Sequence, residues 1–201
     1  MSLASHYSET SLIECGCDEA GRGCLAGSLF AAAVIFPYDY VNPQINDSKK
    51  LNEKLREKLR EEIIKDAIAY AVVEISAQTI DSINILQASI KGMNDAILQL
   101  AIKPELLLID GNRFHTQTGI PYHCIVKGDG KYISIAAASI LAKTFRDDYM
   151  KNLDQEYPQY NWKSNKGYPT EEHQNAIFQY GRTIHHRKSF QLKSQLKLIF
   201  P

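Results

Sequence analysis

The sequence of 201 residues has no long hydrophobic run and no excess of either charge. Its long uncharged runs, such as residues 24–38 and 133–142, are shorter than the roughly 20 residues that span a bilayer. The N-terminus lacks a basic stretch followed by an apolar one, so we expect no secretory signal, no membrane span and a cytoplasmic protein. The 23 basic and 23 acidic side chains balance, which by itself does not favour a nucleic-acid partner.

Several common catalytic signatures are also missing. The four cysteines (Cys15, Cys17, Cys24 and Cys124) lack the paired spacing of a zinc site, so we interpret them as reduced thiols. Neither a G-x-x-x-x-G-K-[ST] phosphate loop nor a G-x-S-x-G motif occurs. The glycines at 21, 23 and 27 are spaced one residue too far apart for the dinucleotide fingerprint. These absences argue against the P-loop, serine-hydrolase and dinucleotide-binding classes.

The last part of the chain is basic. No acidic residue follows Glu172. His185 and His186 have no acidic partner at metal-binding spacing, so we assign them, with Arg187, to a basic surface.

Alternation of apolar segments with segments of helical periodicity predicts an α/β layered domain, and the length fits one domain. The predicted strands are residues 12–17, 26–36, 68–75, 106–109 and 122–126. The predicted helices are residues 48–66, 83–100, 133–153 and 170–180. Residues 158–169 are predicted to be an aromatic loop, in which the rings are expected to pack under the C-terminal helices rather than stack on nucleic acid.

Three acidic positions share one pattern, in which an apolar segment ends, a carboxylate follows and a glycine lies close by. They are Asp18-Glu19 before Gly21, Asp110 before Gly111, and Asp129 between Gly128 and Gly130. A single Asp-Gly pair is more often an ordinary tight turn. Because strand ends of an α/β sheet meet at one rim, however, three such positions can converge there. Oxygen ligands favour Mg²⁺ or Mn²⁺, and two ions about 3.5–4 Å apart stabilise both oxygens of a phosphoryl displacement.

The segment Cys17-Asp18-Glu19-Ala20-Gly21-Arg22-Gly23 closely resembles the first motif of the ribonuclease HII family. Further matching segments follow in family order, from about residue 13 to residue 190. They are Asp47-Ser48-Lys49-Lys50-Leu51, Asp110-Gly111, Lys127-Gly128-Asp129, Ala137-Ala138-Ser139-Ile140-Leu141-Ala142-Lys143 with Arg146-Asp147, Lys166-Gly167-Tyr168-Pro169-Thr170 with His173, and His186-Arg187-Lys188-Ser189-Phe190. Together these motifs are highly specific, although no one of them would be alone.

This resemblance implies the ribonuclease H-like fold, a five-stranded mixed sheet flanked by helices. It implies a single catalytic domain over residues 1–201, with a core of about residues 12–154 and a helical C-terminal portion of about residues 155–201. The implied activity is hydrolysis of the RNA strand of RNA–DNA hybrids and incision 5′ of ribonucleotides embedded in DNA. The implied products of this two-metal-ion catalysis are a 3′-hydroxyl and a 5′-phosphate.

The resemblance also implies roles for individual residues. The metal-binding catalytic carboxylates would be Asp18, Glu19, Asp110 and Asp129, with Mg²⁺ or Mn²⁺ as the cofactor. The backbone of Gly21, Arg22 and Gly23 would contact the ribose 2′-hydroxyl, the group that separates RNA from DNA, and Tyr168 would pack beside the sugar.

Basic residues in the matching segments are candidates for phosphate contacts. They are Lys49, Lys50, Lys143 and Arg146. Lys143 and Arg146 also lie close enough to Asp147 to form ion pairs instead.

One position departs from the family pattern, because Cys24 stands where a proline is more usual; we expect activity to survive this change. In the C-terminal residues we identify no motif of the kind some relatives use to bind the sliding clamp, so clamp association stays open. Nothing in the sequence demands a second subunit, and we expect a monomer. Two other functions stay open: another two-metal nuclease or strand transferase of this fold, and a nucleic-acid-binding module without catalysis.

Overall fold

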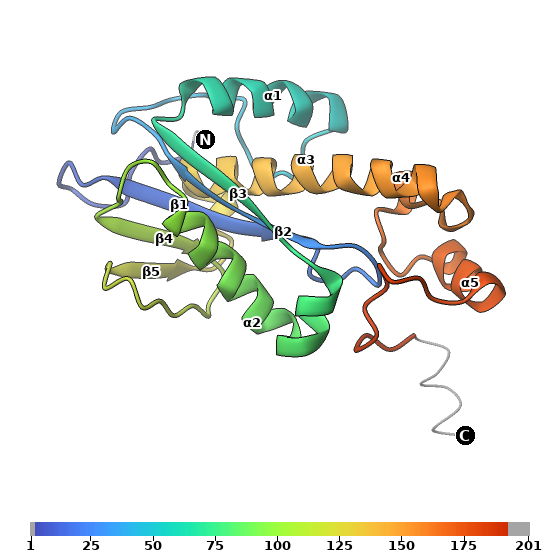
Figure 1. The fold of residues 1–201 in the computed structure, drawn as a ribbon. Helices are drawn as coiled ribbons and strands as arrows, with labels where there is room; N and C mark the ends of the chain where they lie inside the picture. The colour runs from blue at the N-terminus through green and yellow to red at the C-terminus, as the bar shows by residue number, and fades with distance from the viewer. Residues whose placement is uncertain (1–2, 193–201) are drawn as a thin grey trace.

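A five-stranded mixed sheet forms the centre of the protein (Figure 1), whose computed structural model describes residues 3–192. The strands are β1 (Glu14–Ala20), β2 (Leu29–Ile35), β3 (Ala69–Ile75), β4 (Leu106–Asp110) and β5 (Tyr122–Ile125). Their order is β3-β2-β1-β4-β5, in which β1 pairs antiparallel with β2 and parallel with β4. Since β2–β3 is antiparallel and β4–β5 is parallel, the predicted mixed sheet is confirmed.

Helices cover both faces of this sheet. On one face, α2 (Ala77–Leu98) packs against β1, β2 and β3. The other face carries α3 (Ile133–Glu156), which α1 (Glu53–Asp66) covers in turn. At Gly16 the backbones of β1 and α3 nearly touch, because a Cβ there would lie 2.2 Å from the carbonyl carbon of Ser134. The small residues at the start of α3 are buried and permit this approach.

The C-terminal portion contains η2 (Pro158–Tyr160), α4 (Trp162–Asn165) and α5 (Glu171–Tyr180). The predicted aromatic loop is therefore two short helices in its first part. Tyr160 and Trp162 are almost fully buried and their rings stack with centroids 4.9 Å apart, which confirms the expected packing role. Thr170 caps α5, because its hydroxyl accepts a hydrogen bond from the His173 N–H.

Several predicted boundaries are wrong, among them those of α1, α2 and β1. The first helix begins at Glu53 rather than residue 48, because the Asn52 side chain caps it by accepting from the Leu55 N–H. The second helix begins at Ala77 and is interrupted at Asn84, where φ is 66°. Strand β1 continues to Ala20, so Asp18 and Glu19 lie within the strand rather than after it.

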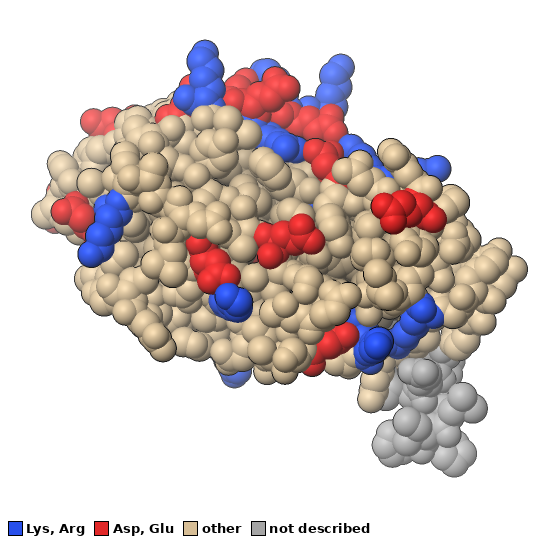
Figure 2. Space-filling view, in the orientation of Figure 1, with Lys and Arg blue, Asp and Glu red and all other residues tan. Residues whose placement is uncertain are grey.

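Charged side chains gather over α1 and the adjoining part of α3 (Figure 2), where ion pairs such as Lys151 with Glu53 and Arg60 with Asp148 link the two helices. Much of the face seen in Figure 2 is uncharged. Within residues 3–192, no helix is both long and apolar enough to cross a membrane.

Candidate active site

The sheet brings two of the predicted carboxylates together at the end of β1 and β4. These parallel strands pair Cys17 with Ile109, so the next residues, Asp18 and Asp110, lie side by side. Asp129 comes from η1 (Gly128–Gly130), the turn between β5 and α3. The N–H of Gly128 donates to Asp110 Oδ1 over 2.7 Å, which ties this turn to the end of β4.

Burial and mutual repulsion both raise the pKa values of these carboxylic acids. Burial raises the pKa of Asp18 well above its usual range, and the neighbouring Glu19 and Asp110 raise it further. Burial also raises the pKa of Glu19, although the Arg22 guanidinium opposes this from 3.1 Å. The pKa of Asp129 is raised by burial and then by Asp110. The site therefore concentrates negative charge that a bound cation would compensate.

The carboxylate oxygens fit a hard divalent cation that takes some of its ligands from the protein and the others from water and a substrate. Among residues 3–192, no three Asp, Glu, His or Cys side chains form a group that could hold a metal by themselves. Mg²⁺ is usually bound by one or two carboxylates together with water and substrate phosphates, so an open set of oxygens is what it requires. The buried Ser89 hydroxyl adds another oxygen beside Glu19.

A hollow of about 440 Å³ opens beside Glu19 and Asp110. Its other lining residues come from the turn after β1, from α2 and from the loop after β4: Arg22, Leu86, Ser89, Met93, Gly111, Asn112 and Arg113. Two guanidinium groups thus border the carboxylates. A phosphate that contacts these arginines would lie beside a cation held by the carboxylates.

Sequence reasoning missed Ser89, Asn112 and Arg113 as members of this site. A signal existed for two of them, because Asn112 and Arg113 directly follow Asp110-Gly111 at the carboxyl end of β4. Ser89 lies beside the apolar stripe of α2, where a hydroxyl has no obvious function until the helix is placed on the sheet.

The glycine turn that follows β1 is closed on one side and open on the other. Gly21 has φ of +99°, and a Cβ there would lie 2.2 Å from Arg146 Nε, so only glycine fits. At Gly23, in contrast, no atom lies within 4 Å of where a Cβ would be. The Cys24 side chain is fully buried beneath the turn, and this burial raises the pKa of its thiol.

Tyr168 is brought to the same turn. The Leu25 N–H donates to the Gly167 carbonyl over 2.8 Å, which places the loop carrying Tyr168 against the segment after Gly23. The Tyr168 side chain is exposed, and the Arg146 guanidinium carbon lies 6.0 Å from its ring centroid. The glycine turn and the loop that carries Tyr168 thus lie against each other.

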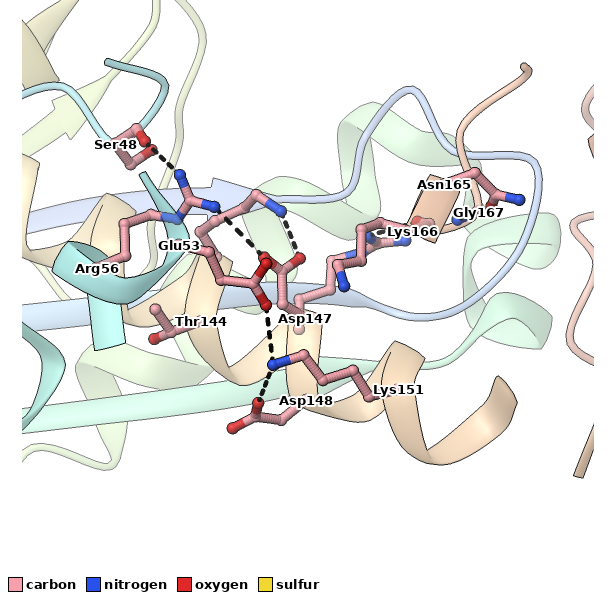
Figure 3. Close-up of polar contacts among 12 residues, drawn as sticks. Ser48, Glu53, Arg56, Thr144, Asp147, Asp148, Lys151, Asn165, Lys166 and Gly167 are labelled. Carbon is pink, nitrogen blue, oxygen red and sulfur yellow. Dashed lines mark hydrogen bonds and ion pairs between the residues drawn. The ribbon is translucent and has the colours of Figure 1, made fainter. Parts of the chain in front are cut away.

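Two of the three lysines proposed for phosphate contacts, Lys49 and Lys143, differ in their surroundings. Lys49 is highly exposed, and its Nζ lies 3.9 Å from Asp129 Oδ2, so it reaches the carboxylate cluster. Lys143 instead forms a close ion pair with Asp147, which also lies 3.9 Å from the Arg56 guanidinium. Figure 3 shows Arg56 reaching Asp147 from α1, so the ion-paired alternative describes Lys143 here.

Three basic residues are buried, contrary to the sequence-based expectation. Arg146, predicted as a phosphate contact, is 1% exposed and donates to the carbonyls of Ala26, Ser28 and Lys166. His186 and Arg187 are also buried and therefore do not belong to a basic surface. The hydrogen-bond partners of all three residues are groups inside the protein.

The sheet, its flanking helices and the acidic rim define a hydrolytic nuclease of the ribonuclease H-like fold. The family model described as Ribonuclease HII matches residues 15–193. The ribonuclease HII of Parabacteroides distasonis is 60% identical over 195 residues, which cover 96% of this chain and 98% of that protein. The chain therefore belongs to the ribonuclease HII family, whose members cleave the RNA of RNA–DNA hybrids.

Solved structures agree on the fold. The ribonuclease H2 of Pyrococcus horikoshii superimposes with a TM-score of 0.76 at 25% identity, over 93% of this chain and 98% of that one. The ribonuclease HII of Archaeoglobus fulgidus, solved as its complex with PCNA, gives a TM-score of 0.77 at 26% identity, over 90% of this chain and 96% of that one.

Proposed function

We propose that this protein incises DNA on the 5′ side of embedded ribonucleotides as well as cleaving the RNA of hybrids, leaving a 3′-hydroxyl and a 5′-phosphate. The observation that carries the proposal is the buried Asp18, whose pKa is raised by burial and by its acidic neighbours Glu19 and Asp110. Such a group is costly unless a cation joins it, and it lies beside a glycine turn with room for a ligand.

Asp18, Glu19, Asp110 and Asp129 would hold two Mg²⁺ or Mn²⁺ ions. When bound, these ions would supply electrostatic stabilisation of the attacking and leaving oxygens. The chain's own groups prepare the ligands, because the Gly128 N–H fixes one oxygen of Asp110 and the Arg22 guanidinium restrains Glu19. Lys49 lies beside Asp129, where its ammonium group can balance the charge of an approaching phosphate.

Ribose recognition would fall to the glycine turn and to Tyr168. A 2′-hydroxyl both donates and accepts, and it alone separates a ribonucleotide from a deoxyribonucleotide. The open face of Gly23 allows the backbone to reach it without an intervening side chain. Tyr168, held against the same segment, presents an exposed ring for the sugar.

The nucleic acid would be the main partner of a monomer working in the cytoplasm. Because the Archaeoglobus fulgidus relative was solved as a complex with PCNA, a sliding clamp is a second candidate partner for this chain. Gel filtration of the protein with a purified clamp would test that association.

The Asp110→Asn variant tests the metal assignment most simply, because it removes a ligand charge and little volume. We expect near-complete loss of turnover, a melting temperature close to that of the wild type, and weaker Mn²⁺ binding by calorimetry with a hybrid duplex present. Asp148→Asn is a matched control that should leave turnover unchanged, since Asp148 pairs with Arg60 of α1 and, as Figure 3 shows, with Lys151 of α3. A wild-type rate in Asp110→Asn would refute the assignment.

A further inference from the structure

Two buried guanidinium groups lie behind the glycine turn, and neither has a carboxylate within ion-pair distance in the described part of the chain. Arg146 donates to three carbonyls outside the turn. Arg187, which is 0% exposed, donates from Nε and Nη2 to the Gly27 carbonyl over 3.0 and 2.9 Å. Its Nη1 donates over 3.0 Å to the carbonyl of Arg22, inside the turn.

Backbone pairing places Arg187 at this position, although 165 residues separate it from Arg22. The segment around His186 forms an antiparallel bridge with Ala26. The Arg187 N–H donates to the Leu25 carbonyl over 2.8 Å, and the Gly27 N–H donates to the His185 carbonyl over 2.9 Å. Burial lowers the pKa of Arg187 to about 10, so its donors all remain protonated at neutral pH.

The contact with Arg22 has a geometric consequence for Gly23. The Arg22 carbonyl and the Gly23 N–H belong to the same peptide unit, and in a planar trans peptide they point in opposite directions. Holding the carbonyl toward the buried Arg187 therefore turns the Gly23 N–H away from the protein. Within residues 3–192, that N–H has no acceptor, and no atom lies within 4 Å of the point that a Cβ of residue 23 would occupy.

We propose that Arg187 is a positioning residue for ribose recognition: by fixing the Arg22 carbonyl, it aims the Gly23 N–H at the 2′-hydroxyl oxygen of the substrate. The proposal rests on the proposed function of the glycine turn and adds the group that orients it. A guanidinium is suited to this task because its rigid fork reaches two carbonyls at once, which a lysine ammonium cannot do with the same geometry.

Arg187→Lys tests the proposal because it keeps the charge and loses the fork. The measurement is the dissociation constant of a DNA duplex with one ribonucleotide and of the same duplex without it, with Ca²⁺ replacing Mg²⁺ to prevent cleavage. The dissociation constant of the all-DNA duplex divided by that of the ribonucleotide duplex should fall about fivefold, which corresponds to one neutral hydrogen bond. The dissociation constant of the all-DNA duplex itself should stay unchanged. A general loss of folded protein would instead weaken the apparent binding of both duplexes equally.

Arg182→Lys is the matched control. Arg182 donates to the carbonyls of Arg187, Lys188 and Phe190, so it supports the same C-terminal segment without touching the turn. We expect this variant to keep the wild-type ratio.

A wild-type ratio in Arg187→Lys would overturn the proposal and leave ribose recognition by the turn intact. Equal wild-type affinity for the two duplexes would overturn both. If the lysine variant does not fold, the wild-type Gly23 amide resonance decides: it should shift with the ribonucleotide duplex and not with the all-DNA duplex. Equal shifts with both duplexes would contradict the proposal.

Discussion

Lowering the pH from 7 to 4 should destabilise this protein through two buried histidines that must remain neutral. The Trp162 Nε1–H donates to His173 Nε2 over 3.0 Å, so the proton of His173 is on Nδ1, 2.9 Å from the Tyr168 carbonyl. The Thr183 N–H donates to His186 Nδ1 over 2.9 Å, so the proton of His186 is on Nε2. That Nε2–H points at His173 Nε2, 3.2 Å away.

A second proton on His173 Nε2 would therefore meet the N–H groups of Trp162 and His186 instead of an acceptor. On His186 Nδ1 it would meet the Thr183 N–H, with only the Thr183 hydroxyl, 3.0 Å away, able to accept it. Both rings are almost completely buried. Burial, reinforced by His173 and by the Arg182 charge, lowers the pKa of His186 to about 3, and burial lowers the pKa of His173 as well. Since His173 holds the Tyr168 carbonyl, protonation would also disturb the loop proposed to contact the ribose.

The sign and size of the effect follow from proton binding. In the unfolded chain His186 has its ordinary pKa of about 6.5, so between about pH 6.5 and 3 the unfolded state binds one more proton than the folded state. The free energy of unfolding must then fall as the pH falls, by up to about 1.4 kcal/mol per pH unit. This contribution is fully present above about pH 6.5 and disappears progressively below it.

Urea unfolding at pH 7, 6, 5.5, 5 and 4.5 measures this slope. His186→Gln keeps an amide that can accept from Thr183 and donate to His173 but cannot titrate. Between pH 5.5 and 4.5, where the unfolded histidine is mostly protonated, its free energy of unfolding should fall about 1.4 kcal/mol less per pH unit than that of the wild type. His185→Gln, on the adjacent residue, should show the wild-type slope. Parallel curves for the wild type and His186→Gln would refute the reasoning.

Three further substitutions follow from the site and the core. Asp18→Asn should abolish hydrolysis yet raise the melting temperature in EDTA by several degrees, because it removes a buried charge; a lower melting temperature would contradict this. Gly23→Ala should melt like the wild type, since no atom lies within 4 Å of the new methyl group, but should cleave ribonucleotide-containing DNA at least tenfold more slowly; an unchanged rate would place the ribose elsewhere. Gly16→Ala should lose about 3 kcal/mol or more in urea unfolding, because its Cβ would lie 2.2 Å from the backbone of Ser134; wild-type stability would show that β1 and α3 can separate.

The carboxylates proposed for the site could be identified in the sequence because their signal is local. Each follows an apolar segment and lies near a glycine, and the parallel pairing of β1 with β4 then brings Asp18 beside Asp110 without further information. The strands were predictable for the same reason, since apolar segments of four to eight residues between turn residues are typical of buried strands.

The buried arginines and histidines could not be predicted, because their partners are distant in sequence and mostly belong to the backbone. Arg187 donates to the carbonyls of Arg22 and Gly27, and no residue type marks a carbonyl as an acceptor. In the sequence, His186 and Arg187 lie among basic residues and have the composition of a solvated surface. The interruption of α2 at Asn84 was missed because an asparagine inside a helix only occasionally marks a new cap.

Incubation of the protein and Mg²⁺ with an end-labelled DNA duplex containing one ribonucleotide tests the proposed incision most directly. We expect a single cut on the 5′ side of the ribonucleotide, which is absent with EDTA and in Asp110→Asn. Cutting of an all-DNA duplex would indicate a general two-metal nuclease instead. Tight binding without cutting, in Mg²⁺ and in Mn²⁺, would contradict the assignment of these carboxylates to catalysis.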